Sequence, residues 1–254
     1  GQGTTLLNKE QVDAFGYEST IRYCQKCTNH CMLTVSSFND GSEHISGNRC
    51  ERGANLPPKS KQLPNLYDYK YRRVFNYRSL TAKEAKRGTV GIPRVLNMYE
   101  NYPFWFTFFT ELGFRVVLSP ASTRKIYELG IESIPSESEC YPAKLAHGHV
   151  QWLINQGVKH IFYPSIPYER KEFADSDNHY NCPVVAYYPE VLEGNCPELN
   201  ATKFIYDYFN LERRKDFYKK FQQALDKYFP GLDKKAVHEA IDAAYDEYAR
   251  HMQQ

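Results

Sequence analysis

Short apolar runs alternate with longer helical patterns after residue 88, and this alternation constrains the fold of the chain more than any other feature. The apolar runs lie at residues 90–96, 115–119 and 160–163 and have the length of buried strands. Helical patterns at residues 99–112 and 142–155 lie between them and end before Gly113 and Gly157. The alternation predicts an α/β fold, in which helices cover both faces of a parallel sheet and ligands bind at the carboxyl ends of the strands.

Two further regions complete the predicted fold. An apolar run at residues 184–188 follows Pro183 and is predicted to be another buried strand. Residues 212–229 and 234–252 carry apolar side chains at helical spacing, and Pro230 separates them. These segments predict two long amphipathic helices that serve as a cap or a docking element.

Length and composition favour one main domain with a smaller satellite. The chain has 254 residues, of which 42% are hydrophobic, and this is enough for one sizeable core. The predicted parts are a cysteine-rich metal-binding β module at residues 1–56, a connector at 57–88, the α/β domain at 89–210 and the C-terminal helices at 211–254.

Charge and hydropathy limit the classes of partner. The 32 lysines and arginines nearly balance the 30 aspartates and glutamates, and the two signs are interspersed, so no nucleic-acid partner is expected. No apolar run reaches the roughly 18 residues of a membrane span, and the start of the chain lacks the pattern of a secretion signal. The chain begins with Gly1 in place of a methionine, from which we expect a processed product or a part of a longer protein.

Four of the seven cysteines form a cluster with the spacing of metal ligands. Cys24, Cys27 and Cys31 lie close together, and Cys50 follows after eighteen intervening residues. Four thiolates suit a structural zinc, which would stabilise a module too small to fold on its core alone, and they also suit an iron–sulfur cluster. The further alternatives are unligated cysteines and a site in which His30 replaces one thiolate. An odd number of cysteines, four of them at such spacing, favours a reducing compartment, so a cytoplasmic location is predicted.

Two other cysteines lie where loops meet regular structure. Cys140 precedes Tyr141-Pro142 at the start of a predicted helix, and Cys182 immediately precedes Pro183. The N-terminus of a helix favours the thiolate form, which suits metal ligation or redox chemistry. The alternative for each is a small buried apolar side chain. Cys196 is predicted to be structural or exposed.

Other candidate residues form weaker patterns. Arg94 lies in the first predicted strand, before the aromatic helix, and is either a contact for an acyl-CoA phosphate or an exposed arginine. Lys144, His147 and His149 lie within reach of a pocket mouth near Cys140, although two histidines two residues apart should not both face it, and we expect at least one to be solvated. Residues 165–168 follow a strand and are predicted to form a wall of the site. No glycine-rich nucleotide-binding motif is present, so the chain is not expected to bind its own nucleotide.

Four segments carry a family resemblance. They are GIPRVLNMYENYPFW at residues 91–105, FFTELGF at 108–114, SESECYPAKLAHGH at 136–149 and NCPV at 181–184. Together with the cysteine cluster, they make residues 20–200 resemble the acyl-CoA dehydratase activase-related domain of the 2-hydroxyacyl-CoA dehydratase and activase superfamily, to which the double-cubane cluster proteins are related.

The resemblance implies more than the residues alone do. It implies a longer polypeptide that carries ATPase activase modules, in a system of anaerobic metabolism that moves electrons at low potential. Proteins of the superfamily hold iron–sulfur clusters on cysteines at strand-to-helix junctions, which implies that Cys140 and Cys182 bind a four-iron, four-sulfur cluster. At least a third thiolate is then needed from Cys196, another domain or another chain.

Two functions are therefore expected to compete. The first is a component of an ATP-dependent 2-hydroxyacyl-CoA dehydratase-type electron-transfer system, which acts on or beside an acyl-CoA substrate as part of an iron–sulfur reductase, dehydratase or activase. The alternative is a non-catalytic, zinc-stabilised module that docks the activase or the dehydratase subunits. The first function predicts that Cys140 and Cys182 converge at the carboxyl edge of the sheet.

Overall fold

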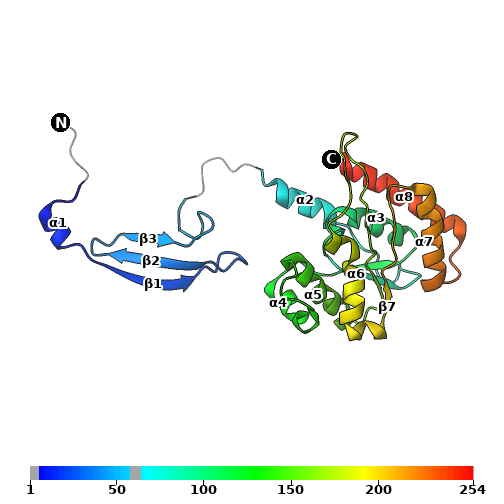
Figure 1. Cartoon of the computed structure of the whole chain (residues 1–254), viewed down its shortest axis with the longest axis horizontal. Helices are drawn as coiled ribbons and strands as arrows, with labels where there is room; N and C mark the ends of the chain where they lie inside the picture. The colour runs from blue at the N-terminus through cyan, green and yellow to red at the C-terminus, as the bar shows by residue number, and fades with distance from the viewer. Residues whose placement is uncertain (1–5, 58–63, 254) are drawn as a thin grey trace. The chain divides into compact units, whose positions relative to one another are not determined.

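A computed structural model describes residues 6–57 and 64–253. The chain divides into two compact units, an N-terminal unit at Gly1–Asn65 and a second unit at Leu66–Gln254 (Figure 1). The boundary falls within the predicted connector, of which residues 58–63 lie outside the described residues. The predicted α/β class is confirmed, with a parallel sheet between helices, a small antiparallel sheet near the N-terminus and helices at the C-terminus.

The N-terminal unit is a three-stranded antiparallel sheet with one short helix. It contains α1 (Lys9–Asp13), β1 (Tyr17–Tyr23), β2 (Met32–Phe38) and β3 (Glu43–Ser46) in the strand order β1-β2-β3. A tight turn joins β2 to β3, in which Gly41 takes a φ of +81° and Asp40 accepts a hydrogen bond from the Ser42 N–H. Among the described residues, the buried apolar side chains of this unit are Cys24, Leu33 and Val35.

The second unit is built on four parallel strands. They are β4 (Thr89–Ile92), β5 (Arg115–Leu118), β6 (His160–Phe162) and β7 (Lys203–Ile205), in the order β5-β4-β6-β7. The chain leaves β4 for β5 on one side and returns to β6 on the other side. The connections therefore reverse direction between β4 and β6, and ligands collect at the carboxyl ends of strands at such a switch point.

Helices cover both faces of this sheet. They are α2 (Leu66–Phe75), α3 (Met98–Glu111), α4 (Arg124–Leu129), α5 (Tyr141–Asn155), α6 (Pro183–Asn195), α7 (Arg214–Tyr228) and α8 (Lys234–Met252), with short 3-10 helices at Ile131–Ser133 and Pro197–Ala201. None of the helices in the described part of the chain is long and apolar enough to cross a bilayer.

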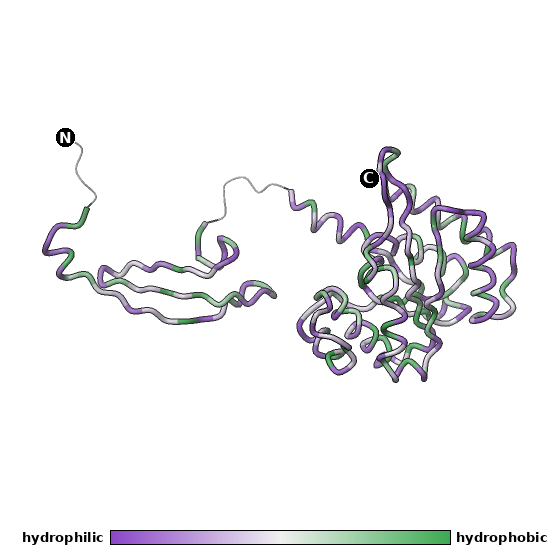
Figure 2. Tube along the Cα trace, in the orientation of Figure 1, coloured by the Kyte–Doolittle hydropathy of each residue, from purple (hydrophilic) through white to green (hydrophobic). Residues whose placement is uncertain are grey.

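Aromatic side chains fill the face of the sheet under α3, α7 and α8. The Trp105 ring of α3 lies 4.7 Å from the Phe162 ring of β6 and 5.5 Å from the Phe221 ring of α7, measured between centroids. Phe104 lies 4.9 Å from Tyr245 of α8. Figure 2 shows hydrophobic stretches in the interior of this unit. Burial of so much aromatic surface stabilises the second unit.

Glycines set the packing on the opposite face, which α5 covers. A side chain at Gly91 of β4 would meet Leu153 of α5 and Val158 beyond it. A side chain at Gly148 of α5 would collide with the backbone of Ile126, so α4 can lie against α5 only because this position has no Cβ. Helix α6 packs beside α5.

The predicted strand at residues 184–188 is wrong, because these residues lie in α6. Pro183 starts this helix at a position where its missing N–H costs nothing, and Cys182 is the N-cap residue. The run Val-Val-Ala-Tyr-Tyr has the composition of a strand, but it forms the start of a helix whose buried side chains are Ala186, Tyr188, Pro189 and Leu192. The fourth strand is β7, which was not predicted from the sequence.

Candidate functional site

The carboxyl edge of the parallel sheet carries the candidate site. The loops after β4 and β6 meet there, where Asn97 Nδ2 donates a hydrogen bond of 3.3 Å to the Pro164 carbonyl across the switch point. Leu96 takes a φ of +40°, a left-handed conformation that is rare for a branched side chain. Such backbone strain is concentrated at binding and catalytic sites in proteins.

Cys140 and Cys182 lie at this edge as the N-cap residues of α5 and α6. Both have extended backbone ψ angles, of 148° and 139°, and in both helices a proline occupies the first turn. Neither thiol caps its own helix, and both side chains are exposed. The structure thus places two available thiols at matching positions on neighbouring helices.

Cys196 lies at the opposite end of α6 from Cys182. It is the C-cap residue of this 13-residue helix, which at about 1.5 Å per residue is roughly 20 Å long. Its side chain is buried, its sulfur lies 3.6 Å from His147 Nδ1, and burial raises the pKa of its thiol. Cys196 therefore cannot complete a ligand set at Cys182. Its burial fits the predicted structural role and does not fit a role as the third cluster ligand.

His147 and His149 are both buried, so the expectation that at least one is solvated is wrong. His147 bonds Ser133 Oγ at 2.8 Å and Tyr188 OH at 2.9 Å, and His149 bonds the hydroxyls of Ser119 and Ser122. Burial lowers the pKa of each imidazole to about 4. The prediction failed because it took no account of tertiary packing. Helices α4 and α6 and the sheet surround α5, so residues on opposite sides of this helix are both buried.

The Arg94 side chain forms hydrogen bonds within the second unit. Its Nε donates to the Ser119 carbonyl at 3.1 Å and its Nη1 donates to Tyr71 OH at 2.5 Å. The guanidinium carbon lies 4.7 Å from the centre of the Phe75 ring. Arg94 is thus half-buried and fixes α2 against the loop after β4, and it is not the exposed arginine of the simpler expectation.

A half-buried carboxylate that was not predicted from the sequence, that of Glu169, lies beside the switch point. Glu169 Oε1 accepts hydrogen bonds of 2.9 Å from Asn101 Nδ2 and from Asn181 Nδ2. Burial raises the pKa of this carboxyl group. Since Asn181 precedes Cys182 and Asn101 lies in the first turn of α3, Glu169 ties the Cys182 loop to the start of α3. Residues 165–168, which were predicted to line the site, immediately precede Glu169.

Buried polar atoms without partners occur at the same edge. Asn97 Oδ1, Asn101 Oδ1 and Tyr163 OH are buried and have no hydrogen-bond partner among the described residues. Buried polar groups are normally paired, so these atoms mark a place where a ligand or water can bind. Burial also raises the pKa of the Tyr163 phenol, which keeps it protonated as a donor.

The four N-terminal cysteines lie toward one end of their sheet. Cys24, Cys27 and Cys31 form the turn between β1 and β2, where the Cys24 N–H donates to the Cys31 carbonyl at 2.9 Å. β3 runs antiparallel to β2, so it ends at the same end of the sheet, and Cys50 follows four residues later. Lys26 Nζ donates to Asn55 Oδ1 at 2.6 Å, which joins the turn at residues 24–31 to the segment that follows Cys50.

The electrostatics of Cys50 favour a ligand role. A hydrogen bond from the Gly53 N–H holds the pKa of the Cys50 thiol below its usual value. Across residues 6–57 and 64–253, no three or more cysteine, histidine or acidic side chains are arranged as a formed metal site. The ligand set Cys24, Cys27, Cys31 and Cys50 therefore stays a prediction.

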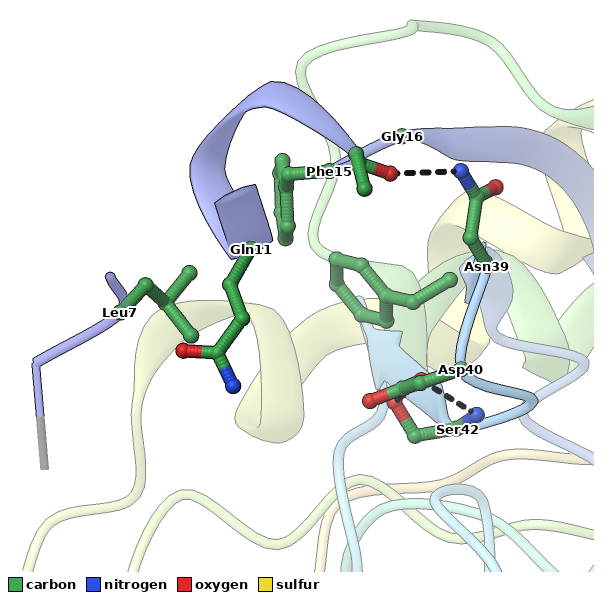
Figure 3. Close-up of a pocket in the computed structure, with 9 residues that line it drawn as sticks. Leu7, Gln11, Phe15, Gly16, Asn39, Asp40 and Ser42 are labelled. Carbon is green, nitrogen blue, oxygen red and sulfur yellow. Dashed lines mark hydrogen bonds between the residues drawn. The ribbon is translucent and has the colours of Figure 1, made fainter. Parts of the chain in front are cut away.

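A separate hollow of about 530 Å³ lies at the other end of this small sheet (Figure 3). Phe15 and Phe38 form its apolar wall, and their ring centres are 5.7 Å apart. The Asp40 carboxylate at its rim is occupied by the Ser42 N–H and hydroxyl. The hollow is lined by no cysteine or histidine of the described residues, so it has no part in the predicted metal chemistry.

Comparison with known proteins supports the family resemblance. Residues 89–254 match the family described as CoA enzyme activase uncharacterised domain (DUF2229). The matched segment begins at the first residue of β4 and includes Cys140, Cys182 and Glu169. No curated protein and no solved structure matches the chain.

Proposed function

Since the chain belongs to the CoA enzyme activase uncharacterised domain family, we propose that it is a component of an ATP-dependent 2-hydroxyacyl-CoA dehydratase-type electron-transfer system. In this proposal Cys140 and Cys182 bind an iron–sulfur cluster, and the partners are ATPase activase modules and an acyl-CoA substrate. The observation that carries the proposal is the pair of exposed thiols at the N-termini of α5 and α6.

The helix geometry supports a shared site for the two thiols. His147 and Tyr188 bridge α5 and α6, and they lie seven residues after Cys140 and six residues after Cys182. Each cysteine is therefore about 10 Å along its helix from the bridge. Packed helices lie about 8–10 Å apart, so two helices that run alongside each other from this bridge would bring both thiols close together at the same edge of the sheet. The Cys140 and Cys182 thiols could then bind the same cluster.

The donor set fits part of a cluster. Both thiols are exposed, and this leaves room for a cluster on them. A bound cluster would supply one-electron transfer at low potential, while the chain's own residues hold and orient it. Because Cys196 lies at the far end of α6, the remaining ligands come from another domain or another chain.

Anaerobic reconstitution with iron and sulfide tests this function. With a small thiol added to supply the missing ligands, the wild-type chain should develop a broad absorption near roughly 400 nm, the sulfur-to-iron charge-transfer region. Cys140→Ser and Cys182→Ser should each lose this band, whereas the matched control Cys196→Ala should keep it. Retention of the full band in both serine variants would contradict the proposal.

The non-catalytic docking module is the second candidate, and the N-terminal unit favours it. This unit has few buried apolar side chains and four cysteines in its turns, as expected of a zinc-stabilised module. A reconstituted protein that contains zinc and stays colourless would assign this function in place of the first.

A further inference from the structure

A pocket of about 660 Å³ lies at the amino ends of β4, β5 and β6, on the edge of the sheet opposite to Cys140 and Cys182. The turn before β4, the first residues of β5, the last turns of α5 and the turn after α5 form its walls. We call it the amino-edge pocket, and its principal residues are Arg87, Thr89, Arg115, Trp152, Gln156 and Lys159.

The amino-edge pocket is cationic. Arg87, Arg115 and Lys159 line it, all three are exposed, and no aspartate or glutamate of the described residues lines it. Within residues 6–57 and 64–253, none of the three cations takes part in an ion pair. His160 lies at the same edge, and its pKa is lowered by burial and then by the charge of Lys203, which pairs with it across β6 and β7. Several uncompensated positive charges therefore surround one hollow.

Helix ends alone do not account for this arrangement. The C-termini of α3 and α5 point to this edge, and their partial negative charges favour nearby cations. Cations that serve only helix ends can extend into solvent, whereas these three line a concave space beside the half-buried Trp152. Gly88 and Gly157 have open space where a side chain would be, so the mouth of the pocket is not obstructed there.

We propose that the amino-edge pocket binds a small ligand with two linked phosphate groups. Arg87, Arg115 and Lys159 would bind the phosphate oxygens through charge-assisted hydrogen bonds, and Trp152 would form the wall beside them. This site lies on the opposite edge from the proposed cluster ligands and depends on none of them. Its failure and the failure of the proposed function are therefore independent.

Inorganic pyrophosphate is the probe, added to the full chain and followed by calorimetry and by tryptophan fluorescence. Trp105 is fully buried and Trp152 lines the pocket, so a change in emission reports on Trp152 and should disappear in Trp152→Phe. We expect saturable binding that weakens as salt is added. Arg115→Gln and Lys159→Gln should each weaken it about tenfold, while the matched control Lys125→Gln, an exposed lysine on α4, should not.

The remaining outcomes assign or overturn the site. ADP that binds tighter than pyrophosphate would assign a nucleotide with its base against Trp152, and equal affinity would assign the diphosphate group alone. Absence of pyrophosphate binding to the wild-type chain would overturn the proposal. The proposal would also be overturned if Arg115→Gln and Lys159→Gln lowered the melting temperature but left the affinity unchanged, because the cations would then serve only the helix ends.

Discussion

The two units of this chain are stabilised in different ways. The N-terminal unit buries Cys24, Leu33 and Val35 among its described apolar residues, and every residue of β1 is exposed. The second unit buries a continuous aromatic and aliphatic core on its parallel sheet. A domain with so little buried surface needs a cross-link or a metal to fold, whereas the second unit does not. The contrast agrees with the prediction that the four cysteines of the smaller unit bind a metal.

Removal of a predicted metal ligand should produce the largest effect and confine it to the N-terminal unit. Metal binding to small thiolate sites contributes about 10–16 kcal/mol of folding free energy, so Cys27→Ser or Cys50→Ser should unfold this unit. Limited proteolysis should then cut β1 and β2 while the second unit survives. If both variants kept bound metal and an unchanged melting temperature, the four-cysteine site would be wrong.

A cavity in the aromatic core should have the converse effect. Phe162 is fully buried and its ring packs against Trp105 and Phe109. Phe162→Ala should lower the unfolding free energy of the second unit by about 3–5 kcal/mol. Both tryptophans lie in this unit, so denaturant unfolding followed by tryptophan fluorescence measures it alone. If Phe162→Ala also abolished metal binding by the N-terminal unit, the two units would fold together.

Acid should weaken the second unit through its buried histidines. The pKa of His147 and of His149 is lowered to about 4 by burial, below the value of about 6.5 in an unfolded chain. Folding therefore favours the neutral imidazole. The unfolding free energy of the second unit should decrease as the pH falls below about 6.5. At about pH 5 each histidine should lower the unfolding free energy by roughly 1–2 kcal/mol relative to neutral pH. Denaturant unfolding followed by tryptophan fluorescence measures this loss. A pH dependence that is unchanged in His147→Gln would contradict this explanation.

Substitution of the exposed thiols should change stability least. Cys140 and Cys182 are N-cap residues without a side-chain capping bond, and serine is a preferred N-cap. Cys140→Ser and Cys182→Ser should leave the unfolding free energy of the metal-free second unit within about 1 kcal/mol of the wild type, or raise it slightly. A loss of several kcal/mol in denaturant unfolding would show that the thiols are structural.

Local patterns predicted most of the fold. The helices at residues 99–112 and 142–155 were placed within one residue of α3 and α5, because apolar spacing and a following glycine mark such helices. The prediction of a strand at 184–188 failed because the β-branched and aromatic residues of this run favour a strand, and the periodicity of so short an apolar run cannot reveal a buried helix. β7 was missed because it begins with Lys203 and contributes only Phe204 and Ile205 to an apolar pattern, whereas β6 lies in the longer apolar run at residues 160–163.

The candidate site was less accessible from the sequence. The positions of Cys140 and Cys182 at helix starts follow from the prolines beside them, although the element after Cys182 was mistaken for a strand. Glu169 meets Asn101 across 68 residues of sequence, and only the meeting of two strand ends brings them together. The burial of both His147 and His149 likewise depends on the packing of α4 and α6 around α5.

Hydrogen–deuterium exchange on the wild-type chain, with its metal and after a chelator has removed it, tests the central contrast most directly. We predict that metal removal abolishes amide protection in β1 and β2 and leaves β4 and β6 protected, because only the N-terminal unit depends on thiolate ligation. Undiminished protection of β2 in the metal-free chain, or a parallel loss of protection in β4 and β6, would contradict it.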